Sequence, residues 1–351
     1  MSVSSWSSKS GAVFAAVALV MVVGACGSDS SSDTTTSGGA DSVKVGLSSI
    51  GPKNDRSFSQ AHYEGAQLAA KEIPGVKFTG IVENADTPQA RIDAFKNLAQ
   101  TDDLILGASA AFADAAPAVA PLFPKKHFVV STGATTKKIP NVTSLVPDEG
   151  LAAVPAGAVM AQLSKTGKIG FIGGAEIPPT VQSLEGVKVG AKSVNPNVKV
   201  LSTIVGDFND AAKAKSATQA LIDGGADQIF AFLDAGIQGV YEAGKAKNTG
   251  VVQIISLRCD EYANVVGSAV ENAQQMMFDA IKAFKAGDLA AGTTFYGLTT
   301  PDYLRFDLCP TYADQPELAA LVKDTTEAVN SGALDVTKVK NTRPSYTVTE
   351  K

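Results

Sequence analysis

The chain contains few of the residues from which catalytic and metal sites are usually built. Its 351 residues include one tryptophan, three cysteines and two histidines, His62 and His127. Neither histidine stands in a His-x-Glu or His-Glu-x-x-His arrangement, so the sequence indicates no zinc-dependent hydrolase or deaminase. We interpret both as structural: His62 as a half-exposed residue of the first helix, and His127 as the first residue of a strand.

Nucleotide-binding loops are lacking too. No Gly-x-Gly-x-x-Gly follows the first predicted strand and no Gly-x-x-x-x-Gly-Lys-Ser/Thr occurs, so neither a dinucleotide loop nor a phosphate loop is indicated. A serine nucleophile needs a partnered base and a calcium-dependent nucleoside hydrolase needs an acidic cluster, and neither motif is found. We therefore predict that the protein is not an enzyme and holds no cofactor or metal.

Basic charge is scarce as well. Lysine and arginine number 30 against 35 aspartates and glutamates, a formal net charge of −5. An acidic chain without a basic stripe is a poor nucleic-acid binder, so no nucleic-acid partner is expected. Hydrophobic residues make up 45% of the sequence and charged residues 19%, which excludes a disordered or collagen-like chain. At about 150 residues per domain, the length predicts two domains.

The N-terminal segment is typical of an exported protein. Residues 12–25 form an uncharged apolar run that is too short to span a bilayer but has the length of a signal-peptide core. The run ends in Val23-Gly24-Ala25-Cys26, which resembles a bacterial lipobox with Cys26 as the lipidated mature N-terminus. The alternative is an ordinary secretory signal with an incidental cysteine. We favour the lipobox, because residues 26–41 have the Ser/Thr/Gly-rich composition of a flexible tether.

Two further cysteines, Cys259 and Cys309, each lie at or just after a predicted strand. In an exported protein such a pair can oxidise. The sequence leaves two possibilities open here, a Cys259–Cys309 disulfide and two buried free thiols.

From residue 41 onward, short β-branched runs alternate with amphipathic helical stretches, the pattern of parallel α/β sheets. One predicted helix begins at Thr87 as N-cap with Pro88 in its first turn, another begins near Asp210, and the longest spans 264–286. A final helix is predicted over 315–331. The predicted strands are 43–49, 76–82, 104–108, 128–131, 168–172, 198–205, 228–233 and 251–257, followed by strand-like pieces at 294–298 and 303–308.

These strands are too many for one sheet of average size, and Ser164-Lys165-Thr166-Gly167 reads as a break between two similar halves. We therefore predict an α/β fold of two doubly wound, Rossmann-like lobes joined by a hinge. In such sheets a ligand binds beyond the carboxyl ends of the strands. The predicted divisions are a signal peptide (1–25), a tether (26–41), an N-terminal lobe (42–147 plus 258–290), a C-terminal lobe (148–257 plus 291–335) and a tail (336–351).

Two aromatic residues stand at equivalent places, each in a loop after a predicted strand and just before a helix. They are Phe58 and Phe208. Each alone is more often a packing residue, but one ring from each lobe could sandwich a flat heterocycle when the cleft closes. The pair therefore favours a binding cleft.

The motifs around these residues resemble a known family. They are Asp55-Arg56-Ser57-Phe58-Ser59-Gln60 followed by Tyr63-Glu64-Gly65, the block 164–174, and Gly206-Asp207-Phe208-Asn209-Asp210. From about Val43 to Leu334 the chain resembles the basic membrane protein family, lipid-anchored receptors of ATP-driven importers whose characterised members bind purine nucleosides.

The resemblance implies a type I periplasmic-binding-protein-like fold that closes on a nucleoside at the extracytoplasmic face of the cell membrane. It implies that Phe58 and Phe208 stack on the base, that Asp55 and Asp114 offer polar contacts, and that Asp234 belongs to the same site. The expected partners are a small-molecule solute, an ABC permease and its ATPase, with the receptor itself a monomer.

Three positions depart from the family pattern. Ser59 replaces an asparagine, Arg258 stands where an aspartate grips ribose hydroxyls, and Glu271 stands where a lysine is expected. One hypothesis keeps an Arg258–Glu271 ion pair with the sugar contacts exchanged. Another has Arg258 facing a ligand carboxylate or phosphate, and a third has both as surface residues of a misaligned segment. The remaining alternatives are a receptor for a non-nucleoside aromatic or anionic solute and a sensory ligand-binding module.

Overall fold

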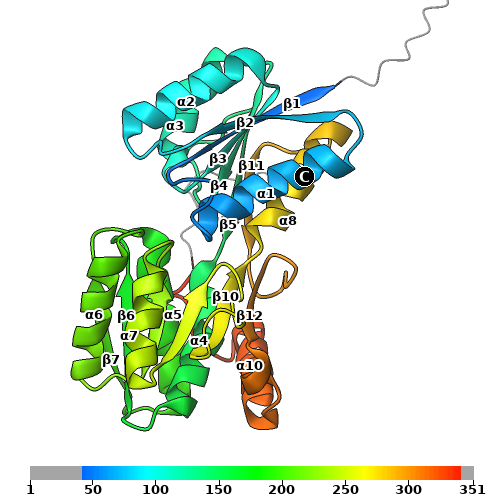
Figure 1. Ribbon diagram of the computed structural model, residues 1–351. Helices are drawn as coiled ribbons and strands as arrows, with labels where there is room; N and C mark the ends of the chain where they lie inside the picture. The colour runs from blue at the N-terminus through cyan, green and yellow to red at the C-terminus, as the bar shows by residue number, and fades with distance from the viewer. Residues whose placement is uncertain (1–41, 341–351) are drawn as a thin grey trace, which may run out of the picture. The chain divides into compact units, whose positions relative to one another are not determined.

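The computed structural model describes residues 42–340, which contain two six-stranded sheets (Figure 1). The first sheet has the order β11-β5-β4-β3-β1-β2, with all neighbours parallel. The second has the order β12-β10-β9-β8-β6-β7, parallel except for β12, which runs antiparallel to β10. The strands are β1 (Val43–Ser49), β2 (Val76–Val82), β3 (Leu104–Ala108), β4 (His127–Ser131), β5 (Val142–Pro147), β6 (Lys168–Gly173), β7 (Lys199–Ile204), β8 (Gln228–Phe232), β9 (Gly250–Ile254), β10 (Val265–Glu271), β11 (Gly292–Tyr296) and β12 (Leu304–Leu308).

Helices cover both faces of each sheet, so the predicted doubly wound α/β fold is confirmed. On the first sheet α1 and α8 lie side by side on one face, and α2 with α3 cover the other (Figure 1). On the second sheet α4, α5 and α10 cover one face and α6 with α7 the other. The helices are α1 (Phe58–Glu72), α2 (Pro88–Thr101), α3 (Phe112–Val119), α4 (Glu149–Leu163), α5 (Pro178–Val194), α6 (Ala211–Asp223), α7 (Ile237–Lys247), α8 (Ala273–Ala286), α9 (Pro310–Ala313) and α10 (Pro316–Ser331), with a short 3₁₀ turn η1 (Ala120–Leu122).

The helix starts expected from the sequence are present. The Thr87 side chain accepts a hydrogen bond from the amide of Ala90 (3.2 Å) ahead of α2, and Asp210 accepts one from the amide of Lys213 (2.9 Å) ahead of α6. Both bonds satisfy amides that have no partner inside the helix. These caps fix where the chain leaves each strand end and turns back along the sheet.

Two strands of the structure were not predicted from the sequence. β5 was not expected, and β10 occupies the start of a segment predicted as one long helix over 264–286. Every residue of both strands is buried, so neither shows the polar–apolar alternation of a half-exposed strand. A short strand that is buried on both faces lacks the alternation by which a strand is recognised, which explains both errors.

Sheet membership corrects the predicted lobe boundaries. β10 lies in the second sheet and β11 in the first, so the chain passes between sheets after Pro147, after Glu271 and between β11 and β12. We call the part around the first sheet the first lobe (42–147 and 272–297) and the rest the second lobe (148–271 and 298–340). The predicted placement of 258–271 with the first sheet, and of β11 with the second, is wrong. Val336 and Val339 are buried in the second lobe's core, so residues 336–340 belong to that lobe and not to a tail.

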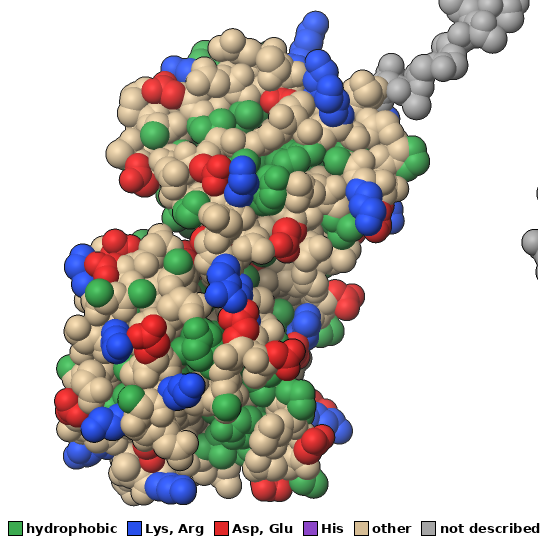
Figure 2. Space-filling view, in the orientation of Figure 1, with side chains coloured by type: hydrophobic (Ala, Val, Ile, Leu, Met, Phe, Trp, Pro, Cys, Tyr) green, Lys and Arg blue, Asp and Glu red, His purple; other side chains and the backbone are tan. Residues whose placement is uncertain are grey.

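The predicted signal peptide, the lipobox Cys26 and the tether lie outside the described residues, as do residues 341–351. Within residues 42–340, no helix is both long and apolar enough to cross a membrane. Cys259 and Cys309 are joined in a disulfide, with 5.5 Å between their Cα atoms. On the face drawn in Figure 2, basic and acidic side chains are interspersed, without a continuous basic stripe.

Helices α4 and α5 pack backbone against backbone. A Cβ atom placed on Gly190 would lie 1.8 Å from the Val154 carbonyl oxygen, and one on Gly186 would lie 2.1 Å from that of Gly150. Contacts this short leave room only for glycine at these two positions of α5. The close packing fixes α4 along its whole length, including its first residue, Glu149.

Gly190→Ala should therefore separate the two helices and destabilise the second lobe by about 1–3 kcal/mol, the usual cost of overpacking a core. The measurement is urea unfolding followed by circular dichroism. Lys192→Ala, at an exposed position of the same helix, is the matched control and should change the unfolding midpoint little. Equal midpoints for the two variants would contradict the close packing.

Candidate binding cleft

The loop after β1 is organised around a buried carboxylate. Asp55 Oδ1 accepts hydrogen bonds from the amides of Ser57 (2.8 Å) and Gln60 (3.1 Å), and Oδ2 accepts one from the amide of Ser59 (2.8 Å). Amides at the start of a helix have no partner within it, and the helix dipole favours a negative charge there. Asp55 therefore holds the first turn of α1 and positions Phe58, the first residue of that helix.

The ring of Phe58 packs on the ring of His62, one turn further along α1. The ring centroids are 4.3 Å apart, and His62 Nδ1 lies 2.8 Å from the Phe58 carbonyl oxygen. His62 Nε2 lies 2.8 Å from the Ser131 hydroxyl at the end of β4. The prediction that His62 is half-exposed is wrong, since the side chain is fully buried. Burial lowers the pKa of His62 to about 4, so the ring is neutral near pH 7.

Phe208 is held just as firmly in the second lobe. Its carbonyl oxygen accepts hydrogen bonds from the amides of Asp234 and Gly236, both at 3.0 Å. Its ring lies directly on the backbone of Gly174, where an added Cβ would come within 2.2 Å of the ring. The position of the ring therefore depends on the absence of a side chain at residue 174.

The two phenylalanines line one cavity, although they come from different lobes. The cavity measures about 60 Å³ and is mostly apolar. It continues into a wider cavity of about 530 Å³ that shares much of its wall. The shared wall consists of Ile50, Ser109, Ala110, Thr132, Ile177, Pro179 and Phe208. An apolar cleft with a few polar groups is the usual form of a small-molecule site.

Asp234 brings a carboxyl group from the second lobe to the first turn of α1. It receives hydrogen bonds from the Ser57 side chain and the Phe58 amide. Burial and the neighbouring Asp55 carboxylate raise the pKa of Asp234 to about 7, while these hydrogen bonds oppose the rise. Asp234 also lines the smaller cavity, so the predicted site residues Asp55, Phe58, Phe208 and Asp234 are brought together.

Two more carboxyl groups are buried where the chain passes between the lobes. Glu149 opens α4 and Glu271 ends β10. Burial, with a contribution from the Asp234 carboxylate, raises the pKa of Glu149 to about 8. Burial and the adjacent Glu149 carboxyl raise the pKa of Glu271 well above its usual value. The two carboxyls share a hydrogen bond, and neither Glu271 oxygen has another hydrogen-bond partner.

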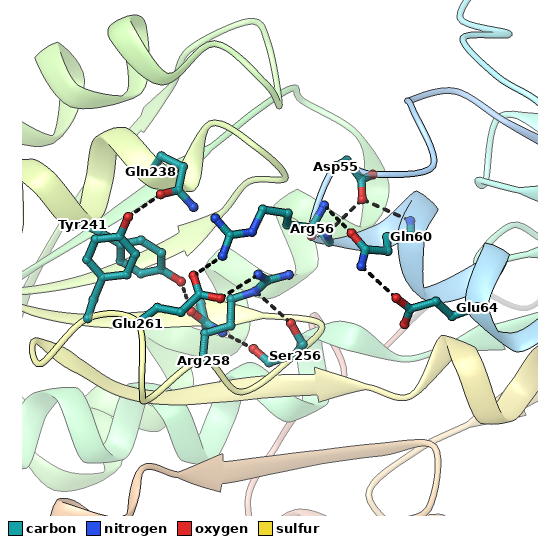
Figure 3. Close-up of polar contacts among 12 residues, drawn as sticks. Asp55, Arg56, Gln60, Glu64, Gln238, Tyr241, Ser256, Arg258 and Glu261 are labelled. Atoms are coloured by element: carbon teal, nitrogen blue, oxygen red, sulfur yellow. Dashed lines mark hydrogen bonds and ion pairs between the residues drawn. The ribbon is translucent and has the colours of Figure 1, made fainter.

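Arg258 lines a cavity together with Glu271 but does not pair with it. Its Nε donates to the Ser256 hydroxyl (3.1 Å) and its Nη1 lies 3.2 Å from Glu261 Oε1 (Figure 3). The other Glu261 oxygen is 2.6 Å from Arg56 Nη2 of the first lobe. Glu261 thus bridges two arginines, and the structure does not form the Arg258–Glu271 ion pair of the exchange hypothesis.

The remaining predicted residues do not line either of these cavities. Asp114 lies on an exposed part of α3, and Ser59 is buried beneath the first turn of α1. Their contact with a ligand stays a prediction. Sequence reasoning missed Glu149, His62 and Gly174 as parts of the site. Glu149 follows a strand that was itself not predicted, so no signal placed it at the cleft.

The raised pKa values of the two glutamates predict a stability that falls with pH. Because the folded protein binds these protons more tightly than the unfolded chain, stability is greatest below the unfolded pKa and is lost as pH rises toward about 8. Glu271→Gln should therefore be more stable than the parent at pH 8, by roughly 2 kcal/mol, with the gap closing toward pH 5. Urea unfolding at several pH values measures the gap.

Glu185→Gln is the matched control, because this glutamate is half-buried on α5 and pairs with Lys188 (2.7 Å). It should show no such pH-dependent gap. A Glu271→Gln difference that stays constant from pH 5 to 8 would contradict the raised pKa values.

Comparison with known proteins agrees with the fold and the cleft. Over 236 residues, 67% of each chain, the protein is 32% identical to the ABC transporter nucleoside-binding protein BmpA of Lactococcus lactis. Over 205 residues, 58% of each chain, it is 30% identical to a purine-binding protein of Brucella abortus. Among solved structures it is similar to an ABC transporter solute-binding protein of Aeropyrum pernix, with a TM-score of 0.74, 20% identity, and coverage of 84% of this chain and 92% of the other.

A second solved solute-binding protein, from Conexibacter woesei, has a TM-score of 0.68 at 23% identity and covers 86% of this chain and 100% of its own. These likenesses show the type I periplasmic-binding-protein fold. The family model described as ABC transporter substrate-binding protein PnrA-like matches residues 42–338. The chain therefore belongs to the PnrA-like (Bmp) family of ABC transporter substrate-binding proteins, which are solute receptors and not enzymes.

Proposed function

We propose that the protein is an extracytoplasmic receptor that delivers a nucleoside, with a purine nucleoside favoured, to an ABC permease and its ATPase. The observation that carries the proposal is the pair Phe58 and Phe208, two held aromatic rings from different lobes on one cavity. Every base has a flat face on which such rings can stack. The names of the Lactococcus and Brucella relatives support a nucleoside or purine as the ligand.

The proposal includes a lipid anchor at Cys26 and a monomeric receptor. The anchor rests on the lipobox-like sequence before Cys26 and on the tether-like composition that follows. It holds the receptor at the outer face of the membrane, where closure of the lobes around the ligand presents a surface for the permease.

Of the alternatives, an anionic solute is disfavoured. The smaller cavity is lined by Glu149 and Asp234, and Arg258, which one of the three hypotheses has facing an anion, is bound to Glu261. A non-nucleoside aromatic solute fits the same pair of rings, and a sensory module would use the same cleft. Ligand titration distinguishes a non-nucleoside aromatic solute from a nucleoside.

Calorimetric titration of the ligand-stripped full chain with adenosine, guanosine, inosine, cytidine, uridine and the free bases tests the proposal. A purine nucleoside should bind one-to-one. Phe58→Ala and Phe208→Ala should each weaken binding by about 5- to 150-fold, because each base–aromatic stack is worth about 1–3 kcal/mol. Leu122→Ala, at an exposed apolar residue of η1, is the control and should bind like the parent. Folded protein that binds none of these compounds would rule out the nucleoside.

A second prediction concerns the support of the Phe208 ring. Gly174→Ala keeps both phenylalanines but places a methyl group where the ring now lies. The displaced ring should weaken nucleoside binding about tenfold, a change of roughly 1.4 kcal/mol. Calorimetry measures the affinity and thermal melting verifies that the variant is folded. A folded Gly174→Ala protein with parental affinity would show that the ring position does not matter.

A further inference from the structure

Glu271 is a buried acid whose neighbour is another acid. The residue is 2% exposed, its carboxyl shares a hydrogen bond with the Glu149 carboxyl, and its two oxygens have no other hydrogen-bond partner. Buried carboxyls in folded proteins are normally hydrogen-bonded or paired with a cation, because removing them from water costs several kcal/mol. Within residues 42–340, no lysine or arginine forms an ion pair with Glu271. The Glu271 carboxyl group therefore has no cationic partner within the described residues.

Three arginines line a cavity together with Glu271, but each of them pairs with another carboxylate. Arg56 and Arg258 both pair with Glu261, and Arg305 Nε lies 2.7 Å from Asp307 Oδ2. The groups that act electrostatically on Glu271 are instead Glu149 and Asp234, which are acids themselves. Asp55 in turn acts on Asp234. Four carboxyl groups thus influence one another around this part of the cleft.

Glu149 connects Glu271 to the aromatic cavity. It lines the cavity that contains Phe58 and Phe208, and it also lines a small adjoining cavity together with Glu271 and Ser183. The Ser183 hydroxyl is buried and has no hydrogen-bond partner. Three polar side chains therefore stand beside the aromatic cavity, and two of them have unused hydrogen-bonding capacity.

A protonated amine matches this arrangement. It carries one positive charge and three N–H donors, and the available acceptors are Glu149, Glu271 and Ser183. A metal ion matches less well, because within residues 42–340 no three His, Cys, Asp or Glu side chains are placed to hold one. An anion would find no positive charge among these three side chains.

We propose that the receptor selects a cationic solute, whose aromatic part lies between Phe58 and Phe208 while its protonated amino group binds Glu149 and Glu271. The aromatic half of this inference rests on the proposed function, and the amine half rests on the carboxyl pair alone. The substrate class is an aromatic heterocycle that carries a basic amine, such as a nucleoside with an amino group on its sugar.

Ligand binding should release protons. Burial raises the pKa values of both Glu149 and Glu271, Asp234 acts in the same direction on both, and Glu149 further raises the pKa of Glu271, so the pair holds protons near pH 7. A bound ammonium group favours the ionised carboxylates and drives protons off. Affinity for an amine should therefore rise between pH 6 and 8, whereas affinity for a neutral solute should not.

Matched pairs of compounds test the inference on the ligand-stripped full chain. The first set compares adenosine with its 2′-, 3′- and 5′-amino-deoxy analogues, because the sugar carbon nearest the carboxyls is not fixed in advance. The second set compares tryptamine with tryptophol, which differ only in the amine and contain no nucleoside. Calorimetry at pH 7, in two buffers of different ionisation enthalpy, gives both affinity and proton release.

At least one amine should bind about tenfold or more tightly than its hydroxyl partner, with proton release. Glu271→Gln should remove this advantage and the proton release, and Glu271→Lys should reverse the preference in favour of the hydroxyl compound. Glu185→Gln, away from the cleft, is the control and should keep the parental ratio. Melting curves verify that each variant is folded.

The two proposals fail in different ways. If adenosine binds and no amine binds better than its hydroxyl partner, the inference is overturned and the nucleoside receptor stands. If tryptamine binds better than tryptophol while no nucleoside binds, the amine site stands and the nucleoside assignment is lost. If no compound in either set binds, both are overturned.

Discussion

The carboxylate of Asp55 holds the first turn of α1, and several of the contacts between the two lobes pass through that turn. Its hydrogen bonds to three backbone amides order the segment that contains Arg56, Ser57 and Phe58. Each of these residues then meets the second lobe: Arg56 pairs with Glu261, and Ser57 and Phe58 donate to Asp234. One buried acid in the first lobe therefore determines both where the aromatic ring lies and how the cleft is closed.

The strengths of these contacts suit a receptor that must open. Arg56 and Glu261 have side chains that are 54% and 31% exposed, and ion pairs of this kind contribute only about 0–1 kcal/mol. The two rings that we propose stack on the ligand are fixed more firmly. Phe208 rests on Gly174 and is held by two backbone hydrogen bonds, and Phe58 rests on the buried His62. An exposed ion pair between the lobes and firm contacts behind each ring favour a hinge motion that leaves the two rings in place.

The sequence predicted the parts of this protein that have a local signal. Helix caps such as Thr87 and Asp210 depend on neighbouring residues, and loop aromatics such as Phe58 and Phe208 stand out where the core does not require them. The paired phenylalanines were therefore found from the sequence. The disulfide was recognised only as one of two possibilities, because its partners are 50 residues apart.

What the sequence could not give depends on packing between distant segments. β10 was taken for the start of a helix because its buried run has no alternation, and that error moved the boundary predicted at 257/258. His62 was placed at the surface because its contact with Ser131 at the end of β4 joins residues 69 positions apart. Glu149 was not recognised because its neighbours in the site, Glu271 and Asp234, come from two other strand ends.

The cost of burying acids bears on what Glu271 does in this cleft. A buried carboxyl that lacks a cation destabilises the folded protein unless it stays protonated, and Glu271 is such a group in the ligand-free chain. A neutral nucleoside would leave Glu271 without a cation, whereas an ammonium group would supply one on binding. A site with an unpaired buried charge discriminates strongly between ligands that do and do not complete it. The same glutamate that lowers stability in the empty receptor thus becomes, in the occupied one, the feature that sets the charge of the solute.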